Sequence, residues 1–185
     1  MNITHYLGEI VQELNKTVDL IPELEAEKLL KSILESKKVF VAGAGRSGLM
    51  GKSFVMRMMH MGIDAYVVGE TVTANLERGD LLIIGSGSGE TSTLIAIAEK
   101  AKKLGGMVAL ISASPESTLG KLADIIVPLP GAQKDKSNSD YHTIQPMGSL
   151  FEQTMLLFYD ALILRFMEIK ELDSSKMYGK HANLE

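Results

Sequence analysis

The sequence predicts an α/β protein, a single-domain three-layer sandwich with a five-stranded parallel sheet flanked by helices. The main observation is that short apolar runs alternate with longer segments of helical periodicity, which is typical of parallel sheets covered on both faces. A second is the composition. The 185 residues are 45% hydrophobic and 23% charged, and the mean hydropathy is +0.11. These values suit one compact domain and exclude a disordered chain.

The predicted elements follow in a simple order. Residues 1–36 predict two helices, at about 2–17 and 22–35, and Pro22 suits a first helical position because its missing N–H has no partner there. Residues 37–130 form the parallel core, with helices at about 47–61, 91–104 and 114–124. The five predicted strands are Lys38–Gly43, Ala65–Gly69, Leu81–Gly85, Met107–Ser112 and Ile125–Pro130. Pro128 predicts that the last of them lies at an edge, since proline cannot donate to a ladder.

The C-terminal part begins with a polar, non-periodic segment at 131–146, predicted to be either a functional loop or a mobile one. Residues 147–185 predict a helix at about 150–170 and a tail. That helix is apolar nearly all round, with one stripe of Phe151, Met155, Phe158, Leu162 and Phe166 and a second that contains Leu157 and Leu164. A surface helix keeps one polar face. We therefore expect this helix to be buried between the subunits of a homo-oligomer.

Composition and charge exclude several classes of protein. The net charge of −4 argues against non-specific nucleic-acid binding, which needs a cationic surface. There is no cysteine, and so no disulfide framework and no thiolate zinc site. The N-terminus lacks a signal pattern, and no run reaches the ~18 apolar residues of a membrane span. We expect a cytoplasmic protein with no nucleic-acid or membrane partner.

Two glycine-rich loops, "GAGRSG" (43–48) and "GSGSGET" (85–91), follow the first and third predicted strands. Ligands of parallel sheets bind beyond the carboxyl ends of the strands, so the two loops predict one shared site. In the second loop, glycines let backbone N–H groups approach a ligand, three hydroxyls offer donors, and a helix N-terminus follows. This pattern predicts a phosphate cradle. The alternative is a plain turn in which Ser88 or Thr91 only caps the helix.

The first loop also spells G-x-G-x-x-G, the fingerprint of dinucleotide binding. That fingerprint needs an acidic residue about 20 positions on, and Glu70 stands 22 residues after Gly48. Against this alternative, Arg46 and Ser47 fill the middle of the loop with donors for a small polar ligand. A dinucleotide also leaves the hydroxyl-rich second loop, after the third predicted strand, unexplained.

Together with "QPMGSLFEQ" (145–153), the two loops resemble the sugar isomerase (SIS) domain family over essentially the whole chain, and so imply a single SIS domain at 1–185. Within that family the chain looks like the isomerases that interconvert 3-hexulose 6-phosphate and fructose 6-phosphate in the ribulose monophosphate route of formaldehyde fixation. The resemblance implies that the sugar phosphate is held by Ser47, Ser86, Gly87, Ser88, Gly89, Glu90 and Thr91. It also implies a tetramer.

Moving a carbonyl from C3 to C2 needs a base, donors for the enediolate and a phosphate anchor, but no redox cofactor. The resemblance points to Glu152 as the base. The alternative is that Ser149 and Glu152, as S-x-x-E, form a capping box. Arg46 is a candidate for binding phosphate or enediolate, or else forms a surface salt bridge.

Two histidines are further acid–base candidates. His60 ends a predicted helix, where it would otherwise only interact with the helix dipole, and His181 stands in a tail that would otherwise be frayed. The four histidines are scattered, so we expect no metal. Glu90 repels phosphate, and we expect its side chain to point away from the cradle although it stands within it.

Other functions remain open from the sequence. One is another SIS-type isomerase that acts on a pentose or heptose phosphate. Another is a non-catalytic sugar-phosphate sensor, although the acidic N-terminal helices would make a poor DNA-reading module.

Overall fold

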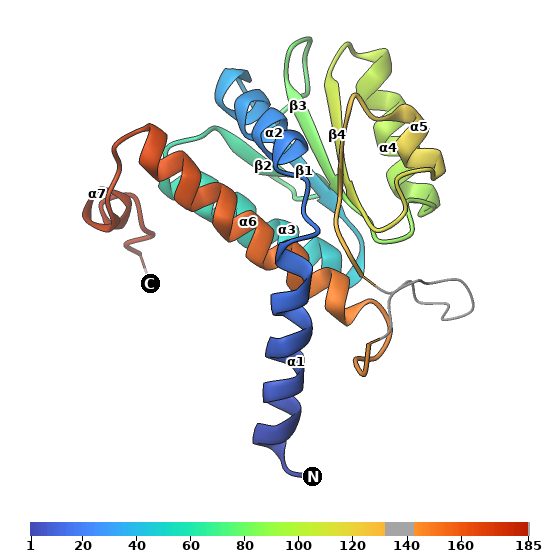
Figure 1. Ribbon diagram of the computed structural model, residues 1–185. Coiled ribbons are helices and arrows are strands. Elements are labelled where there is room, and N and C mark those ends of the chain that lie inside the picture. Colours follow the sequence, from blue (N-terminus) through green and yellow to red (C-terminus); the bar gives the residue numbers. More distant parts are fainter. Residues whose placement is uncertain (132–142, 185) are drawn as a thin grey trace.

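The computed structural model describes residues 1–131 and 143–184, so most of the predicted 131–146 loop lies outside the described residues. It confirms the α/β sandwich (Figure 1). The helices are α1 (Ile3–Val18), α2 (Glu23–Glu35), α3 (Gly45–His60), α4 (Ser92–Lys103), α5 (Thr118–Leu122), α6 (Ser149–Ile169) and α7 (Ser174–Tyr178). The strands are β1 (Val39–Gly43), β2 (Ala65–Val67), β3 (Leu81–Gly85), β4 (Met107–Ser112) and β5 (Ile125–Pro128). Among the described residues, no helix combines the length and apolarity needed to cross a membrane.

The five strands form one parallel sheet in the order β2-β1-β3-β4-β5. β5 lies at an edge, as Pro128 predicted. β2 is shorter than predicted, because the chain turns away at Gly69, whose φ of +97° is a left-handed value that glycine adopts without a steric penalty.

Alternate residues of each strand face opposite layers of helices. In β3, Leu81 and Ile83 belong to one core cluster, whereas Leu82 and Ile84 belong to the other. The first cluster is covered by α2, α3 and α6, and the second by α4 and α5. Because both faces are buried, the strands are continuous apolar runs and not alternating ones.

α6 packs against α3, α1 and α2 within this chain. All five residues of the first predicted stripe, from Phe151 to Phe166, are buried in the chain's own core. The stripe therefore needs no subunit interface to explain it, in contrast to our expectation. The second stripe is different, since Leu157 and Leu164 remain 51% and 67% exposed.

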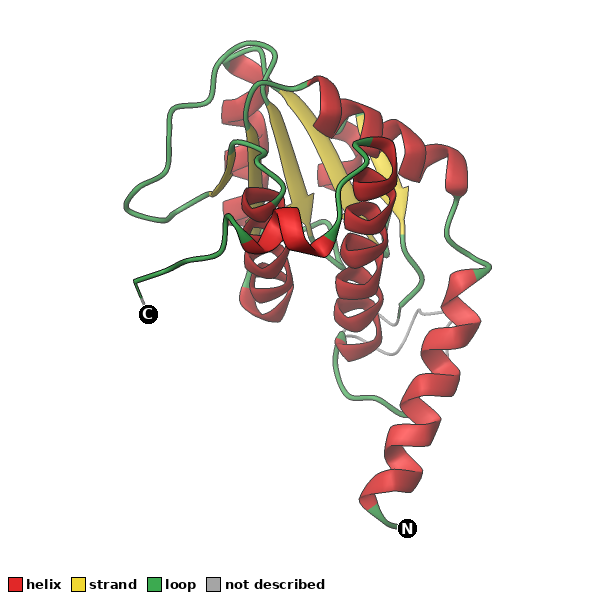
Figure 2. Cartoon of the chain, turned by 90° about the vertical axis from the view of Figure 1, so that its left-hand side faces the viewer, coloured by secondary structure: helices red, strands yellow, loops and turns green. Residues whose placement is uncertain are grey.

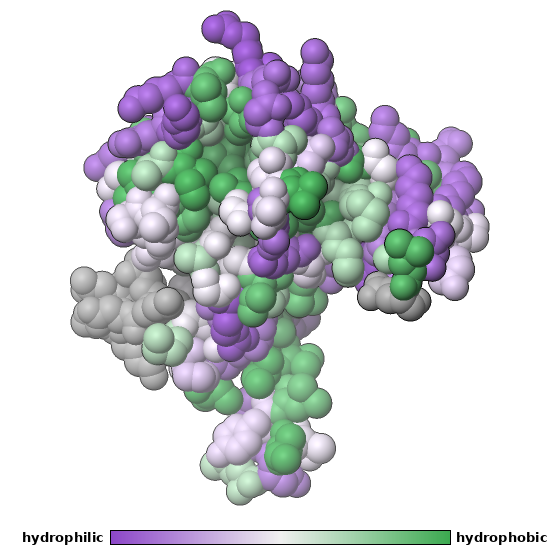
Figure 3. Space-filling model, turned by 180° about the vertical axis from the view of Figure 1, so that it is seen from behind, coloured by the Kyte–Doolittle hydropathy of each residue, from purple (hydrophilic) through white to green (hydrophobic). Residues whose placement is uncertain are grey.

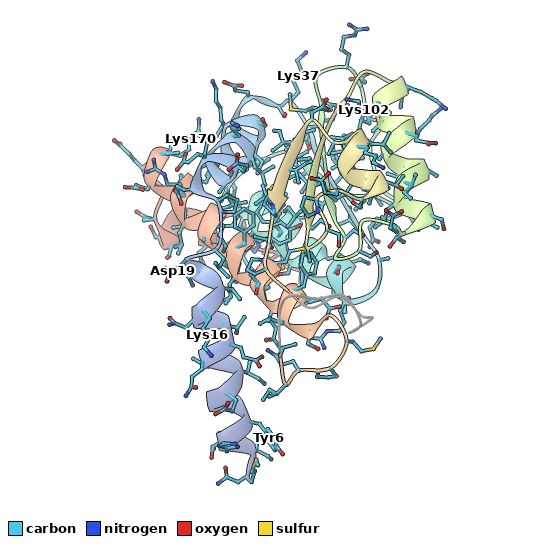
Figure 4. The ribbon with its side chains drawn as sticks, turned by 45° about the vertical axis from the view of Figure 1, so that its right-hand side comes forward. Tyr6, Lys16, Asp19, Lys37, Lys102 and Lys170 are labelled. Atoms are coloured by element: carbon cyan, nitrogen blue, oxygen red, sulfur yellow. The ribbon has the colours of Figure 1, made fainter. Side chains whose placement is uncertain are left out.

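α1 extends beyond the rest of the chain in two perpendicular views (Figures 1 and 2). Tyr6 marks its free end and Asp19 the end at the body (Figure 4). Apolar side chains line the projecting part (Figure 3), among them Ile3, Leu7 and Val11, all more than half exposed. The helix meets the body through its last two turns, where Thr154 Oγ1 lies 3.5 Å from Thr17 Oγ1.

Candidate active site

The two glycine-rich loops lie side by side at the carboxyl edge of the sheet, as predicted. β1 and β3 are neighbours, and Gly43 and Gly85, their last residues, are register partners. In the first loop, a Cβ on Gly48 would lie 2.7 Å from the Gly43 carbonyl oxygen, so α3 approaches β1 as closely as two glycines allow. Gly45 begins α3 with a φ of +57°. Helix–strand packing and a left-handed backbone therefore account for the G-x-G-x-x-G spacing.

The serine-rich loop is held in shape by its own hydroxyls. The buried Ser86 Oγ accepts a hydrogen bond from the Gly89 N–H at 3.2 Å. From β4, Ser112 Oγ donates to the Gly87 carbonyl oxygen at 3.3 Å. Within the described chain, the backbone N–H groups of Gly87 and Ser88 donate to no hydrogen-bond acceptor. This arrangement leaves donors at the sheet edge that an anion can use.

The alternative in which this loop's hydroxyls only cap α4 is wrong. Thr91 is the N-cap residue, but its side chain makes no capping hydrogen bond. Ser88 Oγ accepts from the Glu90 N–H at 3.3 Å, a contact inside the loop. The Thr91 hydroxyl is thus not used by the helix that it precedes.

Glu90 points away from the loop's donors, as its charge predicted. Its carboxylate accepts a hydrogen bond from the Thr118 N–H at 2.7 Å, at the first residue of α5. The backbone and side-chain hydrogen bonds from Thr118 lower the pKa of Glu90 below its ordinary value. Glu90 therefore belongs to the contact between the loop and α5.

Glu152 lies in the first turn of α6, buried, with its carboxylate directed at the first loop. Arg46 Nε lies 2.9 Å from Glu152 Oε2, and Arg46 Nη1 donates to Ser149 Oγ at 3.4 Å. The capping box is also wrong: Gly148 is the N-cap residue, Ser149 is already helical, and the Ser149 N–H donates to the Pro146 carbonyl oxygen. The Glu152 carboxylate is thus free of any capping role and pairs with a guanidinium.

The serine-rich loop also contacts α6. A Cβ on Gly87 would meet Phe151 Cδ1 at 3.2 Å, so the serine-rich loop rests on the first turn of α6. Three segments therefore converge at the carboxyl edge of the sheet, namely 44–48, 86–91 and 148–152. They bring together Arg46, the loop hydroxyls and the Glu152 carboxylate.

The two candidate histidines lie elsewhere in the chain. His60 is buried at the far end of α3, and its ring stacks on that of His181 with centroids 5.2 Å apart. Burial lowers the pKa of His60, and electrostatic repulsion from the neighbouring His181 and Arg57 lowers it further. A cavity of about 460 Å³ opens beside both rings. Because α3 rises 1.5 Å per residue, His60 lies roughly 21 Å along the helix from Arg46.

The acidic residue that a dinucleotide site needs is engaged on the surface. Glu70 Oε1 pairs with Lys52 Nζ, and both side chains are 53% exposed. Two labelled lysines, Lys37 and Lys102, lie at the opposite end of the sheet from the loops (Figure 4). Within the two loop sequences themselves, Arg46 is the one cationic residue. Across the described residues, no group of three His, Asp or Glu side chains is placed to hold a metal ion.

A family model described as the SIS domain matches residues 32–164, well over half of the chain. The chain belongs to the SIS domain family. Among SIS relatives, a Bacillus subtilis (strain 168) protein named 3-hexulose-6-phosphate isomerase is 58% identical over 185 residues, which cover 100% of both chains. A Mycobacterium gastri protein of the same name is 38% identical over 184 residues, covering 100% of this chain and 92% of that one.

A solved structure supports the same SIS fold. The crystal structure of a Methanococcus jannaschii protein, for which a molecular function of 3-hexulose-6-phosphate isomerase was inferred, matches with a TM-score of 0.84 and 33% identity. The match covers 98% of this chain and 99% of that one.

The sequence reasoning missed two supporting residues of this SIS domain. Ser112 is wholly buried and braces the serine-rich loop, and the only signal was a serine at the end of an apolar run. Glu13 of α1 contacts the segment before α6, and nothing local in the sequence marks that contact.

Proposed function

We propose that this chain is a 3-hexulose-6-phosphate isomerase, which interconverts 3-hexulose 6-phosphate and fructose 6-phosphate. The observation that carries the proposal is the buried Glu152 carboxylate, paired with Arg46 at the edge where both glycine-rich loops meet. The full-length similarity to the named Bacillus subtilis relative supports the choice of substrate. We further propose that the enzyme serves the ribulose monophosphate route of formaldehyde fixation, in the cytoplasm, and needs no nucleic-acid or membrane partner.

In this mechanism Glu152 is the general base. Its carboxylate removes the proton from C2, the C2–H electron pair forms the C2–C3 double bond of an enediolate, and a proton then returns at C3. A proton also moves from the oxygen on C2 to the oxygen on C3. The protons balance and no electron leaves the substrate, so the reaction needs no redox cofactor.

In this mechanism Arg46 pairs first with Glu152 and then with the substrate. Without substrate its guanidinium pairs with Glu152, and its side chain is 55% exposed and therefore able to move. An anionic enediolate or phosphate competes for the guanidinium, since planar N–H donors bind such oxygens well. Once Arg46 moves to the substrate, the Glu152 carboxylate is free to accept a proton.

The phosphate is held by the serine-rich loop. The hydroxyls of Ser47, Ser86, Ser88 and Thr91 and the backbone N–H groups of Gly87 and Ser88 supply the donors. Gly89 shapes the loop, since its N–H already donates to Ser86 Oγ. Ser86 therefore offers its hydroxyl proton to the ligand. Glu90 holds the loop against α5 and is not a ligand of the phosphate.

His60 and His181 can assist Glu152 only from another subunit, because within one chain they lie at the other end of α3. We propose a homo-oligomer, with a tetramer expected, in which this end of one subunit faces the loops of another. The exposed apolar side chains of α1 and α6 support such an assembly. If so, mixing the Glu152→Gln and His181→Ala proteins restores part of the activity that each lacks alone. No recovery on mixing would exclude shared sites.

The function is tested by coupling the protein to a hexulose-phosphate synthase supplied with formaldehyde and ribulose 5-phosphate, and measuring fructose 6-phosphate. Glu152→Gln keeps the shape of the side chain but removes the base, so kcat falls by about 10³. Glu168→Gln, the same change on the exposed part of α6, is the matched control and retains the rate. Absence of product with the wild-type protein would refute the assignment, and a normal rate in Glu152→Gln would refute the base.

A further inference from the structure

Glu13 lies on α1 where that helix reaches the body, and it binds the segment that leads into α6. Its carboxylate accepts three hydrogen bonds: from Thr143 Oγ1 at 2.6 Å, the Ile144 N–H at 2.8 Å and Gln145 Nε2 at 2.9 Å. Three donors from consecutive residues meet one carboxylate. Such a contact fixes a short stretch of chain without any regular secondary structure.

The same segment is tightly connected to the start of α6. The Gln145 side chain is buried, and the Gln145 N–H donates to Thr143 Oγ1 at 3.0 Å. Next, the Ser149 N–H donates to the Pro146 carbonyl oxygen at 3.2 Å, and Met147 holds a left-handed φ of 57°. Met147 is not glycine, so this conformation is costly unless its surroundings enforce it. Glu13 holds the stretch immediately before it.

The charge on Glu13 matters for this contact. Burial by itself would raise the pKa of Glu13, but the hydrogen bonds from Thr143, Gln145 and Ile144 outweigh it and lower the pKa. The carboxylate is therefore ionised at neutral pH, and charge-assisted hydrogen bonds are stronger than neutral ones.

We propose that Glu13 is a positioning residue for Glu152. It fixes segment 143–145, which sets where α6 begins and hence directs the Glu152 carboxylate at Arg46 and the substrate. The proposal rests on the proposed function, in which Glu152 is the base. Misplacing a reacting group by about 1 Å can reduce the rate by about 10², so even a small shift of the first turn of α6 is measurable.

A purely structural role would give a different result. If Glu13 only attached α1 to the body, its loss would lower stability and leave the turnover of the folded enzyme unchanged. Turnover is therefore measured well below the unfolding temperature of each variant. In Glu13→Ala, kcat falls about tenfold, while KM stays within about threefold because the phosphate loop is also braced by Ser112 of β4 and by its own Ser86 hydroxyl.

Two further variants sharpen the test. Glu9→Ala makes the same change one turn earlier on α1, where the described residues give Glu9 no hydrogen bond, and it retains the wild-type kcat. Glu13→Gln restores part of the kcat lost in Glu13→Ala, since its amide oxygen still accepts from the Ile144 N–H and the Gln145 amide can rotate to accept from its NH₂ group. The recovery is incomplete because the charge that strengthens these hydrogen bonds is gone.

A double-mutant cycle and hydrogen exchange test whether Glu13 acts through segment 143–145. If Glu13 acts through the segment, Thr143→Ala lowers kcat in the wild type but not further in Glu13→Ala. Hydrogen exchange is faster in Glu13→Ala at the amides of residues 149–152 and unchanged in the middle of α6.

The outcomes are distinct. A wild-type kcat in Glu13→Ala, with Glu152→Gln inactive, would overturn the positioning role alone. A wild-type kcat in Glu152→Gln would overturn the base, and the positioning role with it. Loss of kcat in both variants, with faster exchange at 149–152, supports the proposal.

Discussion

Gly89 in the serine-rich loop is predicted to tolerate no side chain, for two separable reasons. Its φ of +64° lies in the left-handed region, which costs an alanine roughly 1–2 kcal/mol. In addition, an added Cβ would lie 1.9 Å from Ser117 Oγ and 2.4 Å from Ser117 Cβ. Ser117 must then move, and its Oγ would lose the hydrogen bond from the Gly120 N–H that caps α5, a loss of about 1 kcal/mol.

Together these terms give a loss of about 2–3 kcal/mol in the free energy of unfolding for Gly89→Ala. For a chain of this size that corresponds to a fall of roughly 5–10 °C in Tm. Thermal unfolding followed by circular dichroism, at one protein concentration for all variants, measures it.

Two matched variants separate the strain from the collision. Gly79→Ala has a similar left-handed φ of +86° with no atom within 4 Å of the added Cβ, so it loses only the strain energy. In Gly89→Ala with Ser117→Gly the collision is gone and a glycine cap costs only a few tenths of a kcal/mol, so the double variant is more stable than Gly89→Ala. Equal Tm values for Gly89→Ala, Gly79→Ala and the double variant would refute the collision.

Two further predictions concern buried ionisable groups. Asp80 is 1% exposed and accepts hydrogen bonds from the backbone N–H groups of Lys38 at 3.2 Å and Glu77 at 2.8 Å. In Asp80→Asn the new NH₂ group faces one of these donors, so the free energy of unfolding in urea falls by roughly 1–3 kcal/mol, and an unchanged midpoint would contradict the contact. The pKa of His60 lies below its ordinary value of 6.5 in the folded state. Between the folded pKa and about 6.5, the unfolded state binds a proton at His60 and the folded state does not. The free energy of unfolding therefore decreases as pH falls through this window, and above the window His60 causes no pH dependence. Tm measured between pH 8 and pH 5 should show the decrease, and His60→Asn should reduce it; a variant that follows the wild-type curve would rule out His60 as its source.

Much of the fold could be predicted because the local signals agree. The strands are continuous apolar runs, and glycine or proline marks an end of several helices, such as Pro22 before α2 and Gly105 after α4. The positions of both loops followed from the rule that parallel strands end at one edge. The predicted end of β2 was wrong because it depends on a backbone angle. The positive φ of Gly69 turns the chain away, so the strand ends before that residue.

The site was less predictable because its residues are far apart in sequence. Ser149 and Glu152 fit a capping box by spacing, but the packing of the preceding segment makes Gly148 the N-cap residue and leaves the Glu152 carboxylate for Arg46. Only a folded chain brings residues 46 and 152 together. The roles of His60 and His181 stay predictions, since their distance from Glu152 in one chain makes them depend on an assembly.

By itself the sequence determined the layered α/β fold, the shared edge of the two glycine-rich loops and the resemblance to the SIS family, because apolar periodicity and glycine placement act over short stretches. Tertiary structure alone decided that Glu152 faces Arg46, that Glu90 turns to α5, and that Glu13 holds the entrance to α6. The physical reason is that a side chain's partner depends on backbone direction and on packing between distant segments. Neither follows from the spacing of residues along the chain.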